Sequence, residues 1–324
     1  MNSFGSMFRV SLFGESHSTN MGIVVDGVPP GIPFSETLIL PELERRKPGL
    51  PGTTARTEQD KPVIISGLHN GRTTGAPLAI IIKNTNTDSS SYNNITAHPR
   101  PSHSDFSSRI KYNGWNDPRG GGYHSGRLTA LLVCAGALAK TIIAPITVQA
   151  SIQNEHDVRE QAAQAAQTGD SIGAVLEVTI THVPAGLGEP WFNSAESLLA
   201  HAIFSIPGIK AIGFGAGFRA ASMRGSNYND RILDASGKTA SNNDGGITGG
   251  ITNGNPIQFR VAAKPTPSIG IAQETYSFAE DKPAPLTMQG RHDACFALRL
   301  PPVLEAVSAL VMADLMLLRR AYAK

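Results

Sequence analysis

Three short segments of the chain join a titratable side chain to neighbours that bind anions. These segments are Gly14-Glu15-Ser16-His17, Arg100-Pro101-Ser102-His103-Ser104-Asp105 and Arg291-His292-Asp293-Ala294-Cys295. A histidine has an ordinary pKa of about 6.5 and can therefore give or take a proton near neutral pH. Arginine holds carboxylates and phosphates through a planar fork of N–H groups. The three segments therefore predict acid–base chemistry on a phosphorylated substrate.

Other cations accompany these segments. Arg45, Arg46 and Lys47 stand together at the end of a predicted helix, where capping of the last carbonyl groups is an alternative role for some of them. A ligand with several carboxylate and phosphate groups needs many cations, because its charges must be compensated when they leave water. The further candidates for anion binding are Arg56, Arg119, Arg127 and Arg291.

The composition excludes several classes of protein. A formal net charge of +2 indicates neither a nucleic acid nor a membrane as partner. The two cysteines, Cys134 and Cys295, form no CxxC pair, so we predict free thiols and no metal site. No signal peptide pattern is visible, and the apolar stretch 306–318, interrupted by Ser308 and Asp314, is too short to span a bilayer. We therefore expect a cytoplasmic protein without a membrane segment.

Runs of β-branched residues alternate with helical patterns along the chain. This alternation favours an α/β or α+β fold in which helices lie between sheets. The predicted strands are 22–28, 62–68, 77–83, 174–183, 209–218 and 256–263. The predicted helices follow Ser35, with a restart at Pro41 and an end at Pro48, and cover 127–143, 194–204 with Asn193 as cap, and 303–323. Because the helix 127–143 is apolar on almost every side, we expect it to be buried.

A strand, a Val-Pro-x-Gly turn and a helix occur twice, at 24–31 and again 155 residues later at 179–186. Proline and glycine are common in turns, so coincidence is the alternative explanation. Length alone suggests roughly two domains, but no Pro/Ser-rich linker divides the chain. We favour a duplicated half-domain and predict a single domain over residues 1–324 with internal pseudo-symmetry.

Two long polar segments, 84–109 and 229–255, lack a clear helical or strand pattern. Loops of this length in a compact domain are usually disordered or functional. The second contains a glycine-rich tract at 241–250, and its glycines would let the backbone approach a flat or phosphorylated ligand. A flexible surface loop is the alternative for this tract taken alone.

Together the three histidine segments resemble the signature regions of the chorismate synthase family, and the resemblance runs from about Phe8 to about Arg319. The first segment continues into Met21-Gly22 as in that family, and Ser18 stands where a G-x-S-x-G nucleophile elbow would need glycine. The glycine tract followed by 264–268 looks like the family's flavin-binding stretch. The resemblance implies a single-domain β-α-β sandwich of the α/β (α+β) class.

The same resemblance implies an activity. The family converts 5-enolpyruvylshikimate 3-phosphate to chorismate and phosphate by 1,4-anti elimination, and it needs reduced FMN that is not consumed. By this resemblance His17 would protonate or maintain the monoanionic reduced flavin, His103 would protonate the departing phosphate, and Asp293 would assist proton removal through flavin N5. NADPH would take part only if the chain or a partner reduces the flavin. The resemblance also implies a homotetramer and a flavoprotein, a class of proteins associated with FAD and NADP as well as FMN.

The family's motifs also imply ligand contacts at numbered positions. Substrate contacts are expected at Ser16, Arg46 and Arg127. Flavin contacts are expected at Arg46, Tyr123, His124, Ser125, Gly249, Lys264, Pro265, Thr266, Pro267, Ser268 and Arg291.

This chain departs from the family pattern in a few places. Tyr123-His124 replaces an Arg-Ser pair within a Gly-Gly-Gly-Arg-Ser-Ser-Ala-Arg motif, Pro207-Gly208 replaces an Asn-Ala pair, and Gly52 lies near the position of a second cofactor-contacting arginine. An imidazolium on His124 would supply the charge of the lost arginine.

Two other functions fit the same residues. A reductase that uses flavin and NADPH would need similar glycine-rich and basic segments, although no GxGxxG follows a strand here. A non-catalytic relative that binds flavin and substrate is the second alternative, motivated by the departures from the family pattern.

Overall fold

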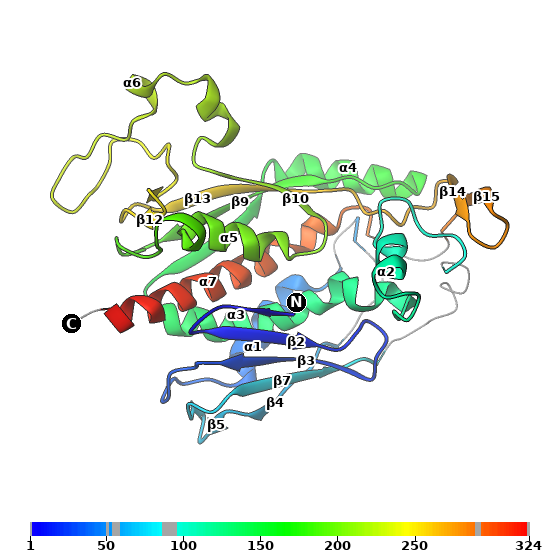
Figure 1. The fold of residues 1–324 in the computed structure, drawn as a ribbon, viewed down its shortest axis with the longest axis horizontal. Coiled ribbons are helices and arrows are strands. Elements are labelled where there is room, and N and C mark those ends of the chain that lie inside the picture. The colour runs from blue at the N-terminus through cyan, green and yellow to red at the C-terminus, as the bar shows by residue number, and fades with distance from the viewer. Residues whose placement is uncertain (1, 50–51, 54–58, 86–95, 289–292, 323–324) are drawn as a thin grey trace.

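Two antiparallel sheets enclose a layer of helices, as Figure 1 shows for the computed structural model. The structure describes residues 2–49, 52–53, 59–85, 96–288 and 293–322. The first sheet has the strand order β1-β2-β3-β7-β4, and its strands are β1 (Ser3–Phe4), β2 (Arg9–Phe13), β3 (Asn20–Asp26), β4 (Pro62–Ser66) and β7 (Leu78–Lys83). The second has the order β10-β13-β9-β8, and its strands are β8 (Thr147–Ile152), β9 (Ala174–Thr181), β10 (Ile209–Phe214) and β13 (Ile257–Ala263).

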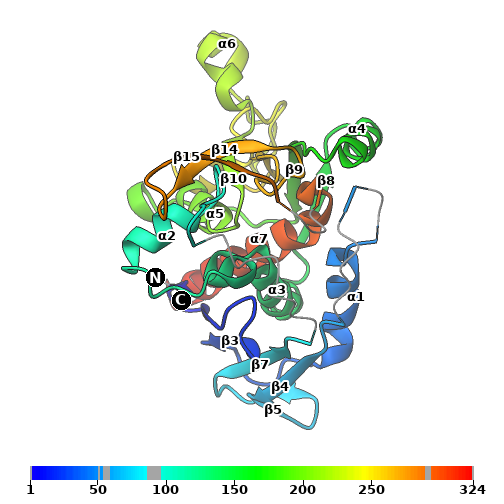
Figure 2. The same ribbon diagram turned by 90° about the vertical axis from the view of Figure 1, so that its right-hand side faces the viewer.

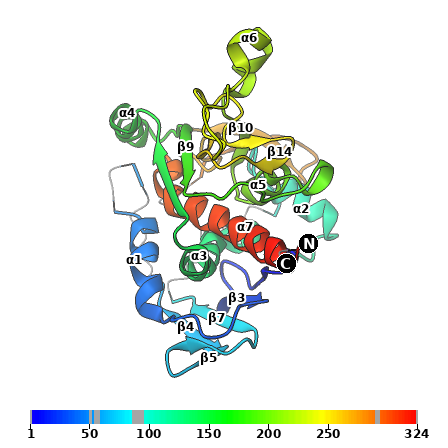
Figure 3. The same ribbon diagram turned by 90° about the vertical axis from the view of Figure 1, so that its left-hand side faces the viewer.

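The helices between the sheets are α1 (Glu36–Arg46), α3 (Thr129–Ile143), α5 (Ala195–Phe204) and α7 (Pro301–Tyr322). Figures 2 and 3 show α3 and α7 side by side at the centre, while α4 (Glu155–Thr168) lies at the β8 edge of the second sheet and α6 (Gly225–Tyr228) projects from the body. The remaining helices are α2 (Asp105–Lys111) and the 3-10 helices η2 (Arg119–His124), η3 (Gly126–Leu128), η4 (Trp191–Asn193), η5 (Gly217–Ser222) and η6 (Phe296–Arg299). The short strand pairs are β5 (Leu68–His69) with β6 (Arg72–Thr73), β11 (Ile247–Thr248) with β12 (Ile251–Thr252), and β14 (Gln273–Ser277) with β15 (Lys282–Leu286).

The two sheets repeat one topology. The first half of the chain forms β2, β3, α1, β4 and β7 in that order, and the second half forms β8, β9, α5, β10 and β13. In both sheets the fourth of these strands pairs between the second and the third. Each half then ends in a long central helix, α3 or α7. The predicted sandwich with internal pseudo-symmetry is therefore confirmed, and the two Val-Pro-x-Gly turns follow corresponding strands of its two halves.

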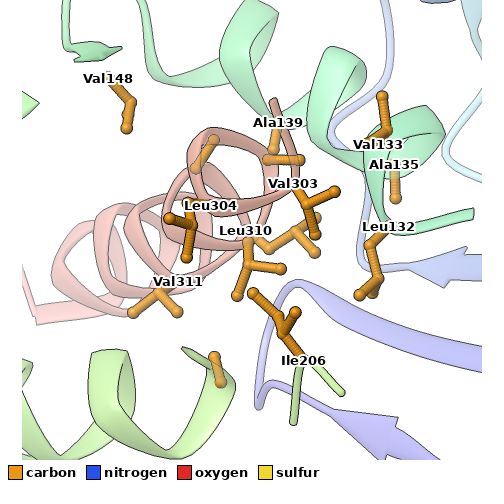
Figure 4. Packing of buried hydrophobic residues seen from close by; sticks show 14 of the residues in the cluster. Leu132, Val133, Ala135, Ala139, Val148, Ile206, Val303, Leu304, Leu310 and Val311 are labelled. Carbon is orange, nitrogen blue, oxygen red and sulfur yellow. The ribbon is translucent and has the colours of Figure 1, made fainter. Parts of the chain in front are cut away.

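The central helices are buried because their sequences offer apolar side chains in almost every direction. Figure 4 shows Leu132 and Val133 of α3 packing in the same cluster as Val303, Leu304 and Leu310 of α7. Burying a side chain of this size stabilises the folded state by about 1.5–3 kcal/mol. The helix α3 ends where Ala144 precedes a proline and has an extended ψ of 134°, because the residue before proline is disfavoured in the helical region.

Buried carboxylates connect these helices to their surroundings. Glu305 of α7 is 4% exposed and accepts two hydrogen bonds of 2.7 Å from the guanidinium of Arg45 and one of 2.8 Å from Lys140. Asp314, further along α7, accepts hydrogen bonds from the backbone N–H groups of Ser6, Met7 and Phe8. A buried carboxylate destabilises a fold unless its oxygens are satisfied in this way.

The six strands and four helices predicted from the sequence are present, with shifted ends and two corrections. The cap of α5 is Ser194, whose hydroxyl accepts a hydrogen bond from the N–H of Ser197 at 3.0 Å, and the predicted cap Asn193 belongs to the preceding turn η4. Pro41 lies inside α1 and does not restart it. The sequence reasoning missed α4, because that helix buries only Ala162 and therefore carries no apolar stripe.

Two helical stretches are long and apolar enough by composition to cross a membrane, so the expectation that 306–318 is too short needs correction. These stretches are Arg119–Ile143 and Pro301–Arg320, and 78% and 83% of their most apolar windows are buried inside the fold. Their apolar surfaces are covered by each other and by the sheets, which is the arrangement of core helices.

The close approach of α3 and α7 predicts the effect of one substitution. A Cβ atom on Gly136 would lie 2.3 Å from the Cβ of Ala306, so Gly136→Ala forces the two helices apart. We expect a loss of about 1–3 kcal/mol in the free energy of unfolding, measured by denaturant titration. The control is Gly225→Ala, where a Cβ meets open space and the change is expected within about 0.5 kcal/mol. Equal stability of both variants would contradict this account of the packing.

Candidate active site

A cavity of about 720 Å³ opens where the first turns of α3 and α7 meet the loops of both halves of the fold. Thr129, at the start of α3, and Leu300 and Val303, at the start of α7, contribute to its wall. In Figure 1 both helices direct these ends toward the side of the molecule that carries α2. Helix N-termini carry partial positive charge, so their position favours an anionic ligand.

His103 lies on the cavity wall in a cluster formed within its own segment. Its Nδ1 atom is 2.6 Å from Oδ1 of Asp105. Two electronegative atoms this close share a hydrogen, so Nδ1 is the protonated nitrogen of the neutral ring and Nε2 is the acceptor. Arg100 donates hydrogen bonds to the same carboxylate from Nε at 2.7 Å and from NH2 at 2.8 Å. Helix α2 begins at Asp105, and the sequence therefore places this carboxylate at a helix start, where a negative charge is favourable.

Burial controls the charges of this cluster. Burial opposes ionisation of Asp105, but the hydrogen bonds from Arg100 and His103 outweigh it and hold the pKa of the carboxyl well below its usual range. Burial lowers the pKa of His103, and Arg100 adds to this effect, whereas Asp105 opposes it. In the free protein His103 is therefore mainly neutral at pH 7, and an arriving anion would favour its charged form.

Two predicted substrate arginines meet at a carboxylate that the sequence reasoning had not singled out. Asp60 is buried, and its oxygens lie 2.9 Å from NH1 of Arg127 and 3.5 Å from NH1 of Arg46. Arg46 also donates to the hydroxyl of Thr129 at 3.0 Å and to the carbonyl of Gly126 at 2.9 Å. Burial, with a further contribution from Arg299, lowers the pKa of Arg46 to about 9, which still leaves the side chain charged at neutral pH.

The first histidine segment packs against the glycine run of η2. His17 is 7% exposed and lies behind Gly120, which lines the cavity together with Ser16. A Cβ on Gly120 would come within 2.6 Å of both Nε2 of His17 and Oγ of Ser16. The backbone of Gly120 has a φ of 58°, and the two glycines that follow it, Gly121 and Gly122, also have positive φ. Glycine is therefore required here both by backbone conformation and by the space that His17 occupies.

The predicted flavin stretch forms a part of the cavity wall next to the second histidine segment. Lys264, Thr266 and Pro267 line it, and Lys264 donates a hydrogen bond to the carbonyl of Ser102. Ser268 accepts a hydrogen bond of 3.0 Å from NH1 of Arg100 and thereby joins this stretch to the second histidine segment. Burial, and then Lys210, lowers the pKa of Lys264. Pro265 lies between these residues in the chain.

Asp293 also reaches the cavity, where its Oδ2 accepts a hydrogen bond of 3.0 Å from NH1 of Arg299. Arg299 lines the cavity as well and donates through Nε to the carbonyl of Arg46. The sequence reasoning missed Arg299, although its position six residues after Asp293 was a usable signal. Arg56 and Arg291 lie outside the described residues, so their predicted contacts stay predictions.

The structure does not bring every predicted residue to the cavity. Gly249 lies in the turn between β11 and β12, exposed, and Figure 1 shows β12 at the end of the molecule away from α2. Arg119 forms an exposed pair with Asp117 and is not among the described lining residues.

The positions that differ from the family pattern do line the cavity. They are Tyr123, His124, Pro207 and Gly208, with Ser125 beside the first two. Gly52 lies close to the third histidine segment, since its carbonyl accepts the N–H of Cys295.

In the free protein His124 is mainly neutral at pH 7, so the predicted imidazolium would form only when an anion binds. Burial lowers the pKa of His124, and the nearby cation of Lys111 lowers it further. Lys111 itself lines the cavity, 5.7 Å from the ring centre of Tyr112. A permanent cation therefore stands close to the position that the neutral His124 leaves uncharged, and the sequence reasoning did not identify it.

Fold and site together define a class of protein. A sandwich of two sheets encloses a cavity in which a histidine held by a carboxylate faces several arginines and lysines. This combination suits an enzyme that moves protons on a ligand with several negative charges.

Comparison with known proteins narrows the class. The family model described as chorismate synthase matches residues 8–157 and 146–317. A chorismate synthase of Chitinophaga pinensis is 52% identical over 324 residues, covering 99% of this chain and 98% of the relative, and one of Pyrococcus abyssi is 42% identical over 350 residues, covering 98% of each. A crystal structure of chorismate synthase matches with a TM-score of 0.73 and 28% identity over 98% of this chain and 93% of the other. The chain therefore belongs to the chorismate synthase family and is a lyase.

The carboxylate beside His103 predicts a measurable change in titration. Asp105→Asn removes the anion that favours the imidazolium, so the pKa of His103 should fall further below its ordinary value. At pH values above the pKa, a decrease of one pKa unit lowers the protonated fraction of the ring about tenfold. The measurement is an NMR titration of the histidine rings, with Ser107→Ala, an exposed change in the same helix, as control. An unchanged or raised pKa in Asp105→Asn would contradict the assigned contact.

Proposed function

We propose that this chain eliminates phosphate from 5-enolpyruvylshikimate 3-phosphate in a 1,4-anti reaction that gives chorismate and requires reduced FMN. One observation carries the proposal: in a member of this family, a histidine held by a buried carboxylate and a cluster of buried arginines line the same 720 Å³ cavity. The volume lies within the range of about 300–1,000 Å³ that is usual for sites of small ligands and cofactors.

The cations of the cavity suit a substrate with two carboxylates and a phosphate. Two of them, Arg46 and Arg127, share the carboxylate of Asp60, so their positive charges exceed the negative charge that holds them. Such pre-arranged guanidinium groups bind anions without first having to be ordered. The cationic side chains that line the cavity are Arg46, Arg100, Lys111, Arg127, Lys264 and Arg299.

The residues present also fit a flavin. Thr266 lines the cavity, and within the described part of the chain its buried hydroxyl has no hydrogen-bond partner. Gly126 lines it too, and a Cβ there would meet open space, so a flat ring can approach the backbone. We propose that Lys264 to Ser268, Tyr123 to Ser125 and Arg46 hold FMN. Reduced FMN supplies, when bound, the electron chemistry that side chains cannot provide.

His103 has the properties of the proton donor to the leaving phosphate. Its Nδ1 is fixed by Asp105, so Nε2 is the nitrogen that exchanges a proton with a ligand. Burial keeps the ring mainly neutral in the free protein, and the negative charge of a bound phosphate raises its pKa. The ring would therefore take up a proton when the substrate binds and give it to the phosphate oxygen as the C–O bond breaks.

Asp293 and His17 are proposed for the other proton movements. Asp293 is held at the cavity wall by Arg299, where a carboxylate can assist removal of the substrate proton. His17 lies behind Gly120 and Ser16, buried beside the cavity, where its ring can hold a proton close to the ligands. Ser16, at the wall itself, is proposed as a substrate contact.

We propose further that the active form is the homotetramer expected from the family and that it acts in the cytoplasm. Gly249 lies exposed in the turn between β11 and β12, away from the cavity of its own chain. If Gly249 contacts a flavin, that flavin must be bound in the cavity of another copy, which supports the oligomer. NADPH is proposed only as a source of electrons for the flavin.

The main test is phosphate release under anaerobic conditions. We expect release with dithionite-reduced FMN and none with oxidised FMN or without flavin, because the side chains alone cannot carry the electron chemistry. The substrate is 5-enolpyruvylshikimate 3-phosphate, and NADPH is followed in a parallel sample. Equal release with oxidised flavin would refute the proposal, net consumption of NADPH would favour the reductase, and binding without release would favour a non-catalytic relative.

The two histidines should each be needed for turnover. His17→Ala and His103→Ala are expected to lower kcat by roughly 10²–10⁴, the usual contribution of a general acid or base, with a modest loss of FMN affinity. The matched control is His156→Ala on the exposed face of α4, which should leave kcat unchanged. A kcat similar to that of the unchanged protein in either active-site variant would remove that residue from the mechanism.

A further inference from the structure

Asn84 joins two parts of the site that are distant in the sequence. It directly follows β7 and is 9% exposed. Its Nδ2 donates hydrogen bonds to the carbonyl of Ser18 at 2.6 Å and to the carbonyl of Glu15 at 3.2 Å. Its Oδ1 accepts a hydrogen bond of 2.7 Å from Nε of Arg127. One buried side chain is thus bonded on both of its polar ends.

The donor end of Asn84 fixes the turn that carries Ser16 and His17. This turn is closed by the N–H of Ser18, which donates to the carbonyl of Glu15 at 3.2 Å, and by the Ser18 hydroxyl. Asn84 bonds the carbonyls at both ends of the turn, and its own N–H donates to the carbonyl of Thr19. The turn is therefore held against the end of β7 at three carbonyl groups.

The acceptor end of Asn84 fixes the guanidinium of Arg127. Asn84 accepts from Nε, and Asp60 binds NH1 at 2.9 Å. A planar group held at two of its nitrogens cannot rotate about its side-chain axis without breaking one of these bonds. The orientation in which Arg127 meets an anion is therefore set in part by Asn84.

We propose that Asn84 is a positioning residue that couples the placement of His17 to the orientation of Arg127, so that proton handling and anion binding share one geometry. This inference rests on the proposed function. Only a carboxamide of this length offers two N–H donors and an acceptor from one side chain. Aspartate would keep the acceptor but place an anionic oxygen against the carbonyls of Glu15 and Ser18.

The first test does not depend on turnover. NMR signals of the histidine rings are compared in Asn84→Ala, in Asn84→Asp and in the control Asn20→Ala, an exposed residue on the neighbouring strand β3. Both Asn84 variants should move the His17 signal and leave the signal of His156 in place, because both lose the donors to the turn. Variants that are folded, as judged by thermal unfolding, but leave the His17 signal unchanged would overturn the proposal. If Asn84→Ala does not fold, Asn84→Asp decides.

The second test uses double-mutant cycles on the reaction. Asn84→Ala should lower kcat roughly 10- to 100-fold, the effect expected when a catalytic group is misplaced by about 1 Å. The same change should have little further effect on kcat in His17→Ala and little further effect on substrate affinity in Arg127→Ala, because the positioned groups are already absent. Losses that simply add in both backgrounds would indicate a general structural role and overturn the coupling. Absence of phosphate release from the unchanged protein would instead refute the proposed function and leave the NMR result to stand.

Discussion

The contact between α3 and α7 is the constraint on which the rest of the structure depends. The two helices touch where Gly136 faces Ala306, with no room for an additional Cβ, and each helix is covered by a sheet on its other side. This packing aligns their first turns at one end of the molecule. Because each helix closes one half of the repeated topology, the cavity forms where the two halves meet. The loops of both halves then supply its walls.

The buried arginines of this cavity can remain charged because each of them lies next to a carboxylate. Asp60 serves Arg46 and Arg127, Asp105 serves Arg100, and Asp293 serves Arg299. An unpaired guanidinium at this depth would be costly to remove from water. The carboxylates therefore do more than balance charge. They fix the direction in which the cations meet a ligand, and in Asp105 the same group orients the imidazole of His103.

Departures from the family pattern change the position of charge around the cavity. Tyr123 and His124 stand where the family motif is expected to have an arginine and a serine, and burial keeps His124 mainly neutral at pH 7 in the free protein. Lys111 lies nearby on a different element, α2. The cavity thus keeps a cation in this region although the motif itself has lost one.

The sequence by itself determined the strands, the central helices and the presence of Arg100, His103 and Asp105 in one segment. These features follow from local patterns: β-branched runs, a helix apolar on every side, and residues two positions apart in one segment. The repeated Val-Pro-x-Gly turn in the sequence also predicted the two related halves. Local chemistry of this kind needs no knowledge of distant parts of the chain.

Only the tertiary structure decided which distant residues share the site. Asp60, Asn84 and Arg299 look ordinary in the sequence, yet they hold Arg127, the His17 turn and Asp293 in place. Gly249 is a further example, since its glycine-rich tract predicted a ligand contact, and the fold places it exposed in the turn between β11 and β12, away from the cavity of its own chain. The physical reason is the same in each case. A buried hydrogen bond or ion pair depends on where the sheets and helices bring two residues together, and the packing of α3 against α7 decides that position.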